Sequence, residues 1–133
     1  MLHPNQFQIN EAWIAFKLNE RPIQTEQDGD FYIFALMDAA SCFILSFLPL
    51  SVESAELSQL DSRRLLKQGQ AHKERWPRTL FVPSEQPATL LAAEAEGLGI
   101  SVVRIAEDEL LPFIGEARQG FREWFGCNQR HGA

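Results

Sequence analysis

The first half of the chain carries three apolar runs that predict three β-strands. Residues 12–18 are apolar at both alternating positions except at Lys17, a pattern typical of a central strand that is covered on both faces. Residues 30–37 and 42–48 are rich in aromatic and aliphatic side chains. Residues 38–41 between them have the length of a hairpin connection, so we expect the three strands to form an antiparallel meander.

Helices and strands alternate after the meander. Ser51 can cap a helix that begins near Val52 and presents Leu57, Leu60 and Leu65 on one face. The other apolar positions of this half fall into two short strands and two further helices.

The next helix lies between two short strands, residues 79–83 and 101–105, and Ser84 can cap it. Its apolar positions are Ala88, Leu91, Ala92, Ala95 and Leu98. The last helix begins at the acidic residues 106–109, and its apolar positions are Leu110, Ile114, Ala117, Phe121 and Trp124.

The element order β-β-β-α-β-α-β-α predicts an α/β (α+β) fold with one five-stranded mixed sheet and helices on its faces. The meander supplies antiparallel strands, whereas strands that alternate with helices pair in parallel through right-handed crossovers. We expect a single domain over residues 1–133, with a core over about residues 11–125 and flexible ends at residues 1–9 and 126–133.

Composition narrows the range of functions. Hydrophobic residues make up 45% and charged residues 23%, as in globular proteins. The net charge of −6 disfavours the chain as a whole as a nucleic-acid binder, because phosphate contacts need clustered Lys and Arg. The apolar runs are too short for a membrane span, the first ten residues do not resemble a signal peptide, and only Cys42 and Cys127 are cysteines. A reduced, cytoplasmic protein without a membrane partner is the simplest interpretation.

Two local phrases accompany this element order. A strand that begins with Trp13 is followed by a hairpin turn of the form Asp-x-x-Ser at residues 38–41. A later passage comprises Pro77, residues 79–82, residues 84–87, Leu91 and residues 98–100. Over roughly residues 11–105, the chain resembles the ribonuclease-H-like fold, in its retroviral-integrase and transposase branch. It also resembles small bacterial proteins that carry no assigned activity.

The resemblance implies where the metal-binding carboxylates of that family would lie. Two-metal phosphoryl transfer needs carboxylates that converge on two divalent cations. The first would lie in the middle of strand one, but residues 13–16 contain no acid. The second would follow strand four, where Glu85 lies, and the third would come from the last helix, where Glu116 and Glu123 lie outside any matching motif. The chain therefore resembles a degenerate member, for which no catalytic residue, metal ion or cofactor is predicted.

The alternative is a divergent metal-dependent nuclease or transferase that uses Glu85, Glu116 and Asp38. Against it, Asp38 lies at a hairpin corner, where an aspartate side chain can accept hydrogen bonds from nearby backbone N–H groups. Glu85 lies at a predicted helix start, where a carboxylate favours the helix dipole. We therefore predict structural roles for both residues.

Half of the basic residues fall within sixteen positions, opposed there only by Glu74: Arg63, Arg64, Lys67, Lys73, Arg75 and Arg78. A solvated helix end and loop is the simpler interpretation. The functional interpretation is a binding patch for an acidic partner or for nucleic acid, which would make the chain an adaptor that acts through residues 63–78.

The third strand carries a candidate interface. Phe43, Leu45 and Phe47 are expected to share one face of this strand at the edge of the sheet. An edge strand that is apolar on both faces exposes apolar surface unless a partner covers it. The sequence therefore predicts a homodimer or a protein partner. The leading functional hypothesis is a non-catalytic ribonuclease-H-like domain that acts in binding or assembly.

Overall fold

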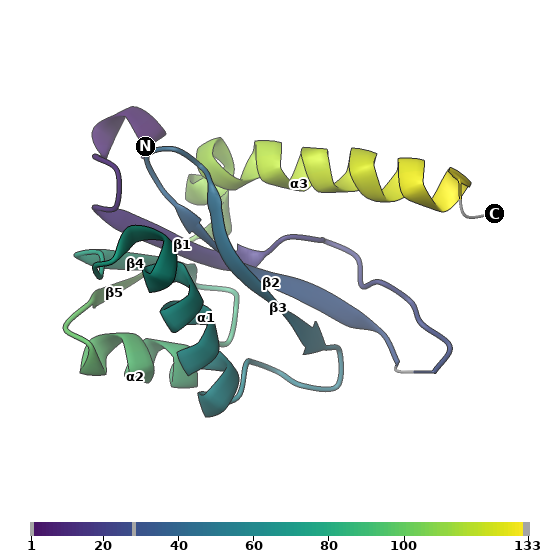
Figure 1. Ribbon diagram of the computed structural model, residues 1–133, viewed down its shortest axis with the longest axis horizontal. Coiled ribbons are helices and arrows are strands. Elements are labelled where there is room, and N and C mark those ends of the chain that lie inside the picture. The colour runs from purple at the N-terminus through teal and green to yellow at the C-terminus, as the bar shows by residue number, and fades with distance from the viewer. Residues whose placement is uncertain (1, 28, 132–133) are drawn as a thin grey trace.

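The computed structural model describes residues 2–27 and 29–131, except for the side chains of residue 73 and residues 125–131. Its centre is a five-stranded sheet with the strand order β3-β2-β1-β4-β5 (Figure 1). The strands are β1 (Ala12–Lys17), β2 (Phe31–Asp38), β3 (Ile44–Ser51), β4 (Thr79–Pro83) and β5 (Ser101–Ile105). The first three pair antiparallel, and β1, β4 and β5 pair in parallel. The predicted mixed sheet is confirmed.

Three α-helices cover the two faces of the sheet. They are α1 (Gln59–Lys73), α2 (Thr89–Gly97) and α3 (Glu107–His131), and a short 3-10 helix, η1, spans Pro4–Gln6. Figure 1 shows α1 and α2 on one side of the strands and α3 on the other. The result is a three-layer arrangement with the sheet in the middle.

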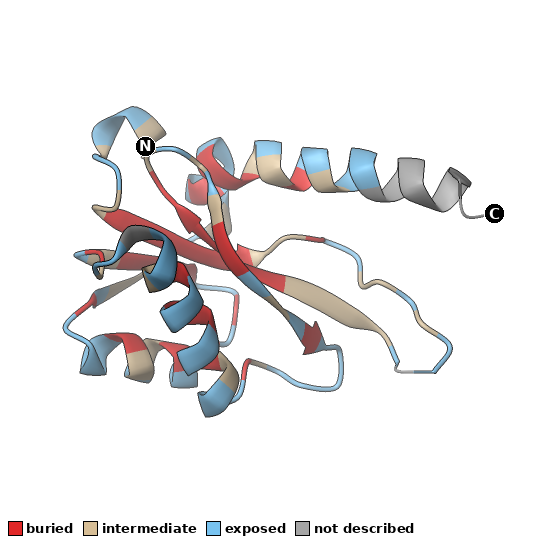
Figure 2. Ribbon diagram, viewed as in Figure 1, coloured by how far each residue is buried: buried red, intermediate tan, exposed pale blue. Residues whose placement is uncertain are grey.

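Strand β1 is buried on both faces, as its apolar pattern predicts. Trp13 and Ala15 pack in the core beneath α1 and α2, whereas Ile14 and Phe16 pack in the core beneath α3. All four side chains are fully buried, and Figure 2 shows the centre of the sheet as buried. Together with its neighbours β2 and β4, β1 thus separates two apolar cores.

The predicted start of the first helix is wrong by several residues. Ser51 is the last residue of β3, and α1 is capped instead by Ser58, whose hydroxyl accepts a hydrogen bond from the Asp61 N–H. Strand β3 continues through Pro49, which an edge strand tolerates because it has a neighbour on one side only. As a result Leu60 is exposed, although Leu57 and Leu65 are buried.

The start of α2 also differs from the prediction. Its N-cap residue is Ala88, which offers no side-chain hydrogen bond, and Ser84 lies outside the helix. A distant carboxylate takes over part of this role, because Glu56 Oε1 accepts a hydrogen bond of 2.7 Å from the Leu90 N–H. Leu98, expected in the apolar stripe, is exposed.

Helix α3 is longer than its pattern suggests. Leu110, Phe113 and Ile114 are fully buried against the sheet, whereas Trp124 is 62% exposed. The helix continues to His131. Figure 1 shows the C-terminal half of α3 running beyond the strands.

A β-bulge in β3 corrects the predicted interface. Leu36 pairs with Ser46 and Met37 pairs with Ile44, so Leu45 is an extra residue between them. The bulge turns Leu45 into the core beneath α1, where it is 2% exposed. Phe43 and Phe47 are 54% and 60% exposed. The expectation that all three side chains share one face is therefore wrong for Leu45.

Gly69 lets α1 lie close against the sheet. A Cβ atom at this position would lie 2.6 Å from Leu36 Cδ2 and 3.4 Å from Trp13 Cη2. Both neighbours are fully buried, so neither can move aside without disturbing the core.

We expect Gly69→Ala to lower the free energy of unfolding by about 1 kcal/mol. Overpacking costs roughly 1–3 kcal/mol, and the better helix propensity of alanine returns up to about 1 kcal/mol. Gly120→Ala in α3 is the matched control, since its Cβ would meet nothing within 4 Å, and it should stabilise the protein. Urea unfolding measures both variants, and a Gly69→Ala variant that is stabilised like the control would contradict the close packing.

Candidate functional site

The candidate site is a cavity of about 350 Å³ at the carboxyl ends of β1 and β4. Its lining residues are Lys17, Asn19, Glu20, Tyr32, Pro83, Glu85, Gln86, Glu107 and Arg118. Lys17 ends β1, Glu85 follows β4, and Glu107 and Arg118 lie on α3. In α/β proteins the carboxyl ends of parallel strands are a common place for ligands.

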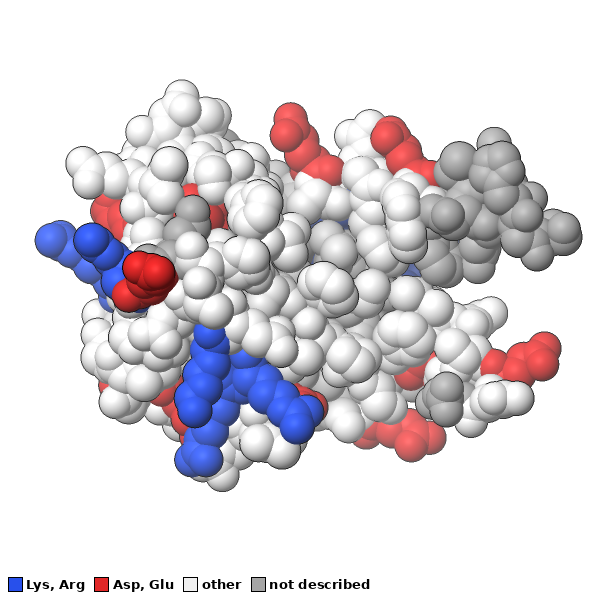
Figure 3. All heavy atoms as spheres, in the orientation of Figure 1, with Lys and Arg blue, Asp and Glu red and all other residues white. Residues whose placement is uncertain are grey.

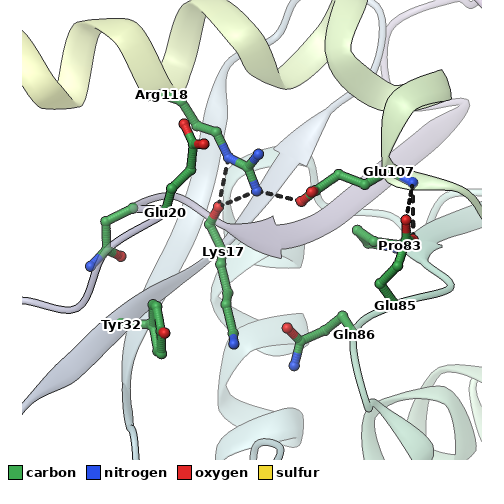
Figure 4. A pocket seen from close by; sticks show the side chains of 9 residues that line it. Lys17, Glu20, Tyr32, Pro83, Glu85, Gln86, Glu107 and Arg118 are labelled. Carbon is green, nitrogen blue, oxygen red and sulfur yellow. Dashed lines mark hydrogen bonds and ion pairs between the residues drawn. The ribbon is translucent and has the colours of Figure 1, made fainter.

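The guanidinium of Arg118 is fixed inside this cavity. The residue is 6% exposed. Its Nε and Nη2 atoms donate hydrogen bonds of 3.0 and 2.9 Å to the Lys17 carbonyl oxygen, and Nη2 also lies 2.6 Å from Glu107 Oε1 (Figure 4). These contacts tie α3 to the end of the central strand and neutralise the Glu107 carboxylate.

The ammonium group of Lys17 lies in the same cavity. Its Nζ atom is 4.0 Å from the centre of the Tyr32 ring, a distance typical of a cation–π contact. Burial lowers the pKa of Lys17, and the nearby charge of Glu107 opposes that shift. Within residues 2–27 and 29–131, no carboxylate forms an ion pair with Nζ.

Glu85 caps α3 rather than α2. Its two carboxylate oxygens lie 3.1 and 3.3 Å from the Glu107 backbone nitrogen, which donates to them, and its Oε1 also accepts from the Ser84 hydroxyl. Backbone hydrogen bonds lower the pKa of Glu85, those from its own N–H and from that of Glu107 being the largest causes. The prediction of a dipole partner identified the role but the wrong helix, because α2 starts only at Thr89.

Asp38 lies at the other end of the sheet and organises the hairpin corner. Its fully buried carboxylate accepts hydrogen bonds of 2.9 and 2.7 Å from the N–H and hydroxyl of Ser41, and one of 2.7 Å from the Asn10 N–H. The Asn10 side-chain oxygen in turn accepts the indole N–H of Trp13. The Trp and Asp-x-x-Ser phrases of the sequence therefore belong to one hydrogen-bond network.

The three alternative catalytic carboxylates are not brought together. Asp38 pairs with Trp13 at the start of β1, whereas Glu85 follows β4, which runs parallel to β1. The six residues of β1 extend over about 20 Å at roughly 3.3 Å per residue. Glu116 is exposed on α3. Burial raises the pKa of Cys42, and the charges of Glu116 and Asp38 add to that shift. In the described part of the chain, no three His, Cys, Asp or Glu residues are grouped to hold a metal ion.

The basic segment is split and partly neutralised. Arg63 forms an ion pair of 3.0 Å with Glu94 of α2, and Arg64 lies 3.8 Å from Asp61. Arg75 and Arg78 border a separate cavity beyond the end of α1. The side chain of Lys73 lies outside the described residues. Figure 3 shows basic side chains over the layer of α1 and α2, with acidic side chains beside them.

Two exposed aromatic residues, Phe43 just before β3 and Phe47 within it, lie near a further cavity. The Phe43 ring packs against His72 of α1 at a centroid distance of 6.0 Å. Phe47 borders a cavity of about 480 Å³, whose other lining residues are Ile44, Leu45, Ser46, Gln68, Ala71 and His72. The β3 edge thus combines an exposed aromatic side chain with an adjacent hollow.

Comparison with one solved structure, a retroviral intasome chain, supports the ribonuclease-H-like fold class. A chain of the simian T-cell lymphotropic virus intasome, solved in complex with PP2A regulatory subunit B56 gamma, matches 97% of this chain with a TM-score of 0.56 and 14% sequence identity. This chain spans 44% of that one. A chain of the Mos1 strand transfer complex aligns with 73% of this chain, with a TM-score of 0.44 and 12% sequence identity. The alignment covers 35% of the Mos1 chain.

No protein-family model and no curated protein sequence matches the chain. Among the described residues, no helix is both long and apolar enough to cross a bilayer.

Sequence reasoning did not identify the residues of the cavity, apart from Glu85. Lys17 gave a signal, because it is the only charged residue in an otherwise apolar central strand. Arg118 gave none, since its contact with Lys17 joins residues 101 positions apart.

We expect Glu85→Gln to lower the thermal unfolding midpoint at pH 7 and to have little effect at low pH. A folded-state pKa below the ordinary value of 4.5 means that the carboxylate stabilises the fold above pH 4.5 and that this contribution is lost as the pH falls through the lowered pKa. Thermal unfolding between pH 7 and pH 3 measures the difference. Glu96→Gln, at an exposed position of α2, is the control, and a Glu85→Gln effect that stays constant over this range would contradict the capping role.

Proposed function

We propose that the chain is a non-catalytic ribonuclease-H-like domain that acts as a binding and assembly module. One observation carries this proposal. The three elements that supply metal ligands in the resembling family are strand one, the residues after strand four and the last helix. Here the end of strand one supplies Lys17, the residues after strand four supply Glu85, and the last helix supplies the ion-paired Glu107 and Arg118 to one cavity.

The charges of these groups oppose metal binding. The guanidinium of Arg118 places a positive charge inside the cavity. Glu107 is paired with Arg118, and Glu85 accepts hydrogen bonds from the start of α3. A divalent cation would have to displace these partners and approach two positive side chains, which repel it most strongly where water is excluded.

The β3 edge supports the assembly part of the proposal, with a second copy of the chain as the partner. Phe47 is 60% exposed beside a cavity that a partner's aromatic side chain can enter. In a two-fold dimer each copy presents both the Phe47 ring and the cavity, so the ring of one copy can pack into the cavity of the other. The bulge at Leu45 and the missing N–H of Pro49 interrupt the edge, which favours contact through side chains over extension of the sheet.

The basic segment receives less support as a nucleic-acid site. Two of its arginines, Arg63 and Arg64, already face carboxylates. Binding of nucleic acid would need these charges to be free for phosphates.

We expect no nuclease or strand-transfer turnover with Mg²⁺ or Mn²⁺, because residues 13–16 of strand one carry no acid and the cavity contains two positive side chains, Lys17 and Arg118. Assays on DNA and RNA substrates, with calorimetric titration of Mn²⁺ to millimolar concentration, provide the measurement. Glu85→Gln and Glu116→Gln should leave any background rate unchanged. Turnover that either variant abolishes, or saturable Mn²⁺ binding, would refute the non-catalytic assignment.

We expect Phe47→Asp to shift a concentration-dependent dimer to monomer, since a charge at this position cannot enter an apolar hollow. Light scattering over about 1–100 μM covers the range expected for a transient interface. Leu111→Asp is the control, because Leu111 is 46% exposed on α3, away from β3. A wild-type chain that is monomeric throughout, or a dimer insensitive to Phe47→Asp, would rule out this interface.

A further inference from the structure

We propose that the cavity at the carboxyl ends of β1 and β4 binds a small-molecule carboxylate, with the Lys17 ammonium and the Tyr32 hydroxyl as its donors. The inference rests on the proposed function only in treating this cavity as a binding site and not as a metal site. It adds the chemical class of the ligand.

The charges that line the cavity leave one group unpaired. Glu107 is neutralised by Arg118, and Glu20 lies 2.6 Å from Arg122 in an ion pair. Glu85 is held by backbone N–H groups at the start of α3. Lys17 alone among these charged residues contacts only an aromatic ring in the described part of the chain. Its partly desolvated ammonium therefore forms no direct ion pair, and Glu107, whose charge acts on it, is already paired with Arg118. An anion that enters the cavity can supply a direct partner.

The surrounding groups are fixed in place for such a ligand. Figure 4 shows the end of the Lys17 side chain between the Tyr32 ring and the Gln86 amide. Gln86 is 7% exposed, its side chain donates to the Pro87 carbonyl, and its own backbone carbonyl accepts a hydrogen bond from Arg104. Within the described residues, the Tyr32 hydroxyl forms no hydrogen bond to the protein, so it is available as a second donor.

The volume of the cavity and the charges that line it indicate the class of ligand. About 350 Å³ lies near the lower end of the range for small-molecule pockets. One unpaired ammonium matches the single negative charge of a carboxylate. A phosphate dianion would bring a second charge close to Glu85 and Glu107, and like charges at short range are unfavourable in a partly desolvated site.

The test is an NMR titration of the ¹⁵N-labelled full chain with sodium acetate at constant ionic strength, with chloride and inorganic phosphate in parallel. We expect saturable shifts at the backbone amides of Lys17, Tyr32 and Gln86, with a dissociation constant on the order of millimolar for so small a ligand. Chloride and phosphate should give weaker or linear shifts. Acetate should also raise the pKa of Lys17, because an anionic partner favours the charged amine.

Variants locate the site. Lys17→Met keeps the length of the side chain and should weaken acetate binding by about tenfold or more, since a hydrogen bond to a charged group is lost. Tyr32→Phe removes one neutral donor and should weaken binding several-fold. Lys67→Met, at an exposed position of α1, should leave binding unchanged, and the dispersion of each spectrum checks that the variant is folded.

Linear acetate shifts equal to those of chloride would overturn the inference, as would saturable binding that Lys17→Met leaves intact. Phosphate binding as tight as that of acetate would overturn the choice of a carboxylate. Each of these results is independent of the nuclease assays. If the chain binds no acetate and shows no turnover, only the proposed ligand is refuted. Metal-dependent turnover would refute the proposed function itself.

Discussion

The alignment of the strands in the sheet depends on the hydrogen bonds that the buried Asp38 carboxylate accepts. The carboxylate accepts hydrogen bonds from Ser41 at the hairpin corner and from the Asn10 backbone, which enters β1. Asn10 has a positive φ of 65°, and its side chain binds both Trp13 and the Arg75 carbonyl beyond α1. One carboxylate thus aligns the β2–β3 hairpin, the start of the central strand and the segment that leads to β4. Its removal would leave three buried or partly buried donors without an acceptor, which is costly in a core.

Elements of the fold could be predicted where the local apolar pattern and the tertiary packing favour the same structure. Residues 79–83 and 101–105 were predicted as strands with the bounds that the structure has, because short apolar runs between helices have one compatible arrangement. The start of the first helix could not be predicted, because Ser51 and Ser58 are equally good N-cap residues by sequence. Only the pairing of β3 with β2 through Ser51 decides between them. The bulge at Leu45 likewise cannot be predicted from sequence, because it lies within a run of mostly apolar residues that gives no signal for it.

The candidate site was predictable only in part. Its location follows from the strand order, and Glu85 was found there because it follows a strand. Its chemistry depends on contacts between residues far apart in sequence: Arg118 with Lys17, and Arg122 with Glu20. No spacing rule reports such pairs, because α3 reaches the end of β1 only after the whole sheet has formed. The unexpected carboxylate caps from Glu56 to α2 and from Glu85 to α3 have the same origin.

The burial of β1 on both faces also has a consequence for sequence divergence. Alternate residues of this strand belong to two different apolar cores, and the backbone between them keeps the side chains of one core out of the other. Changes in packing that do not share partners are close to additive in free energy. The side with α1 and α2, which borders the β3 edge, can therefore be remodelled while the side with α3 keeps its own packing. Each layer of helices can therefore change at its own rate, provided that residues 12–16 of β1 stay small or apolar enough to pack in both cores.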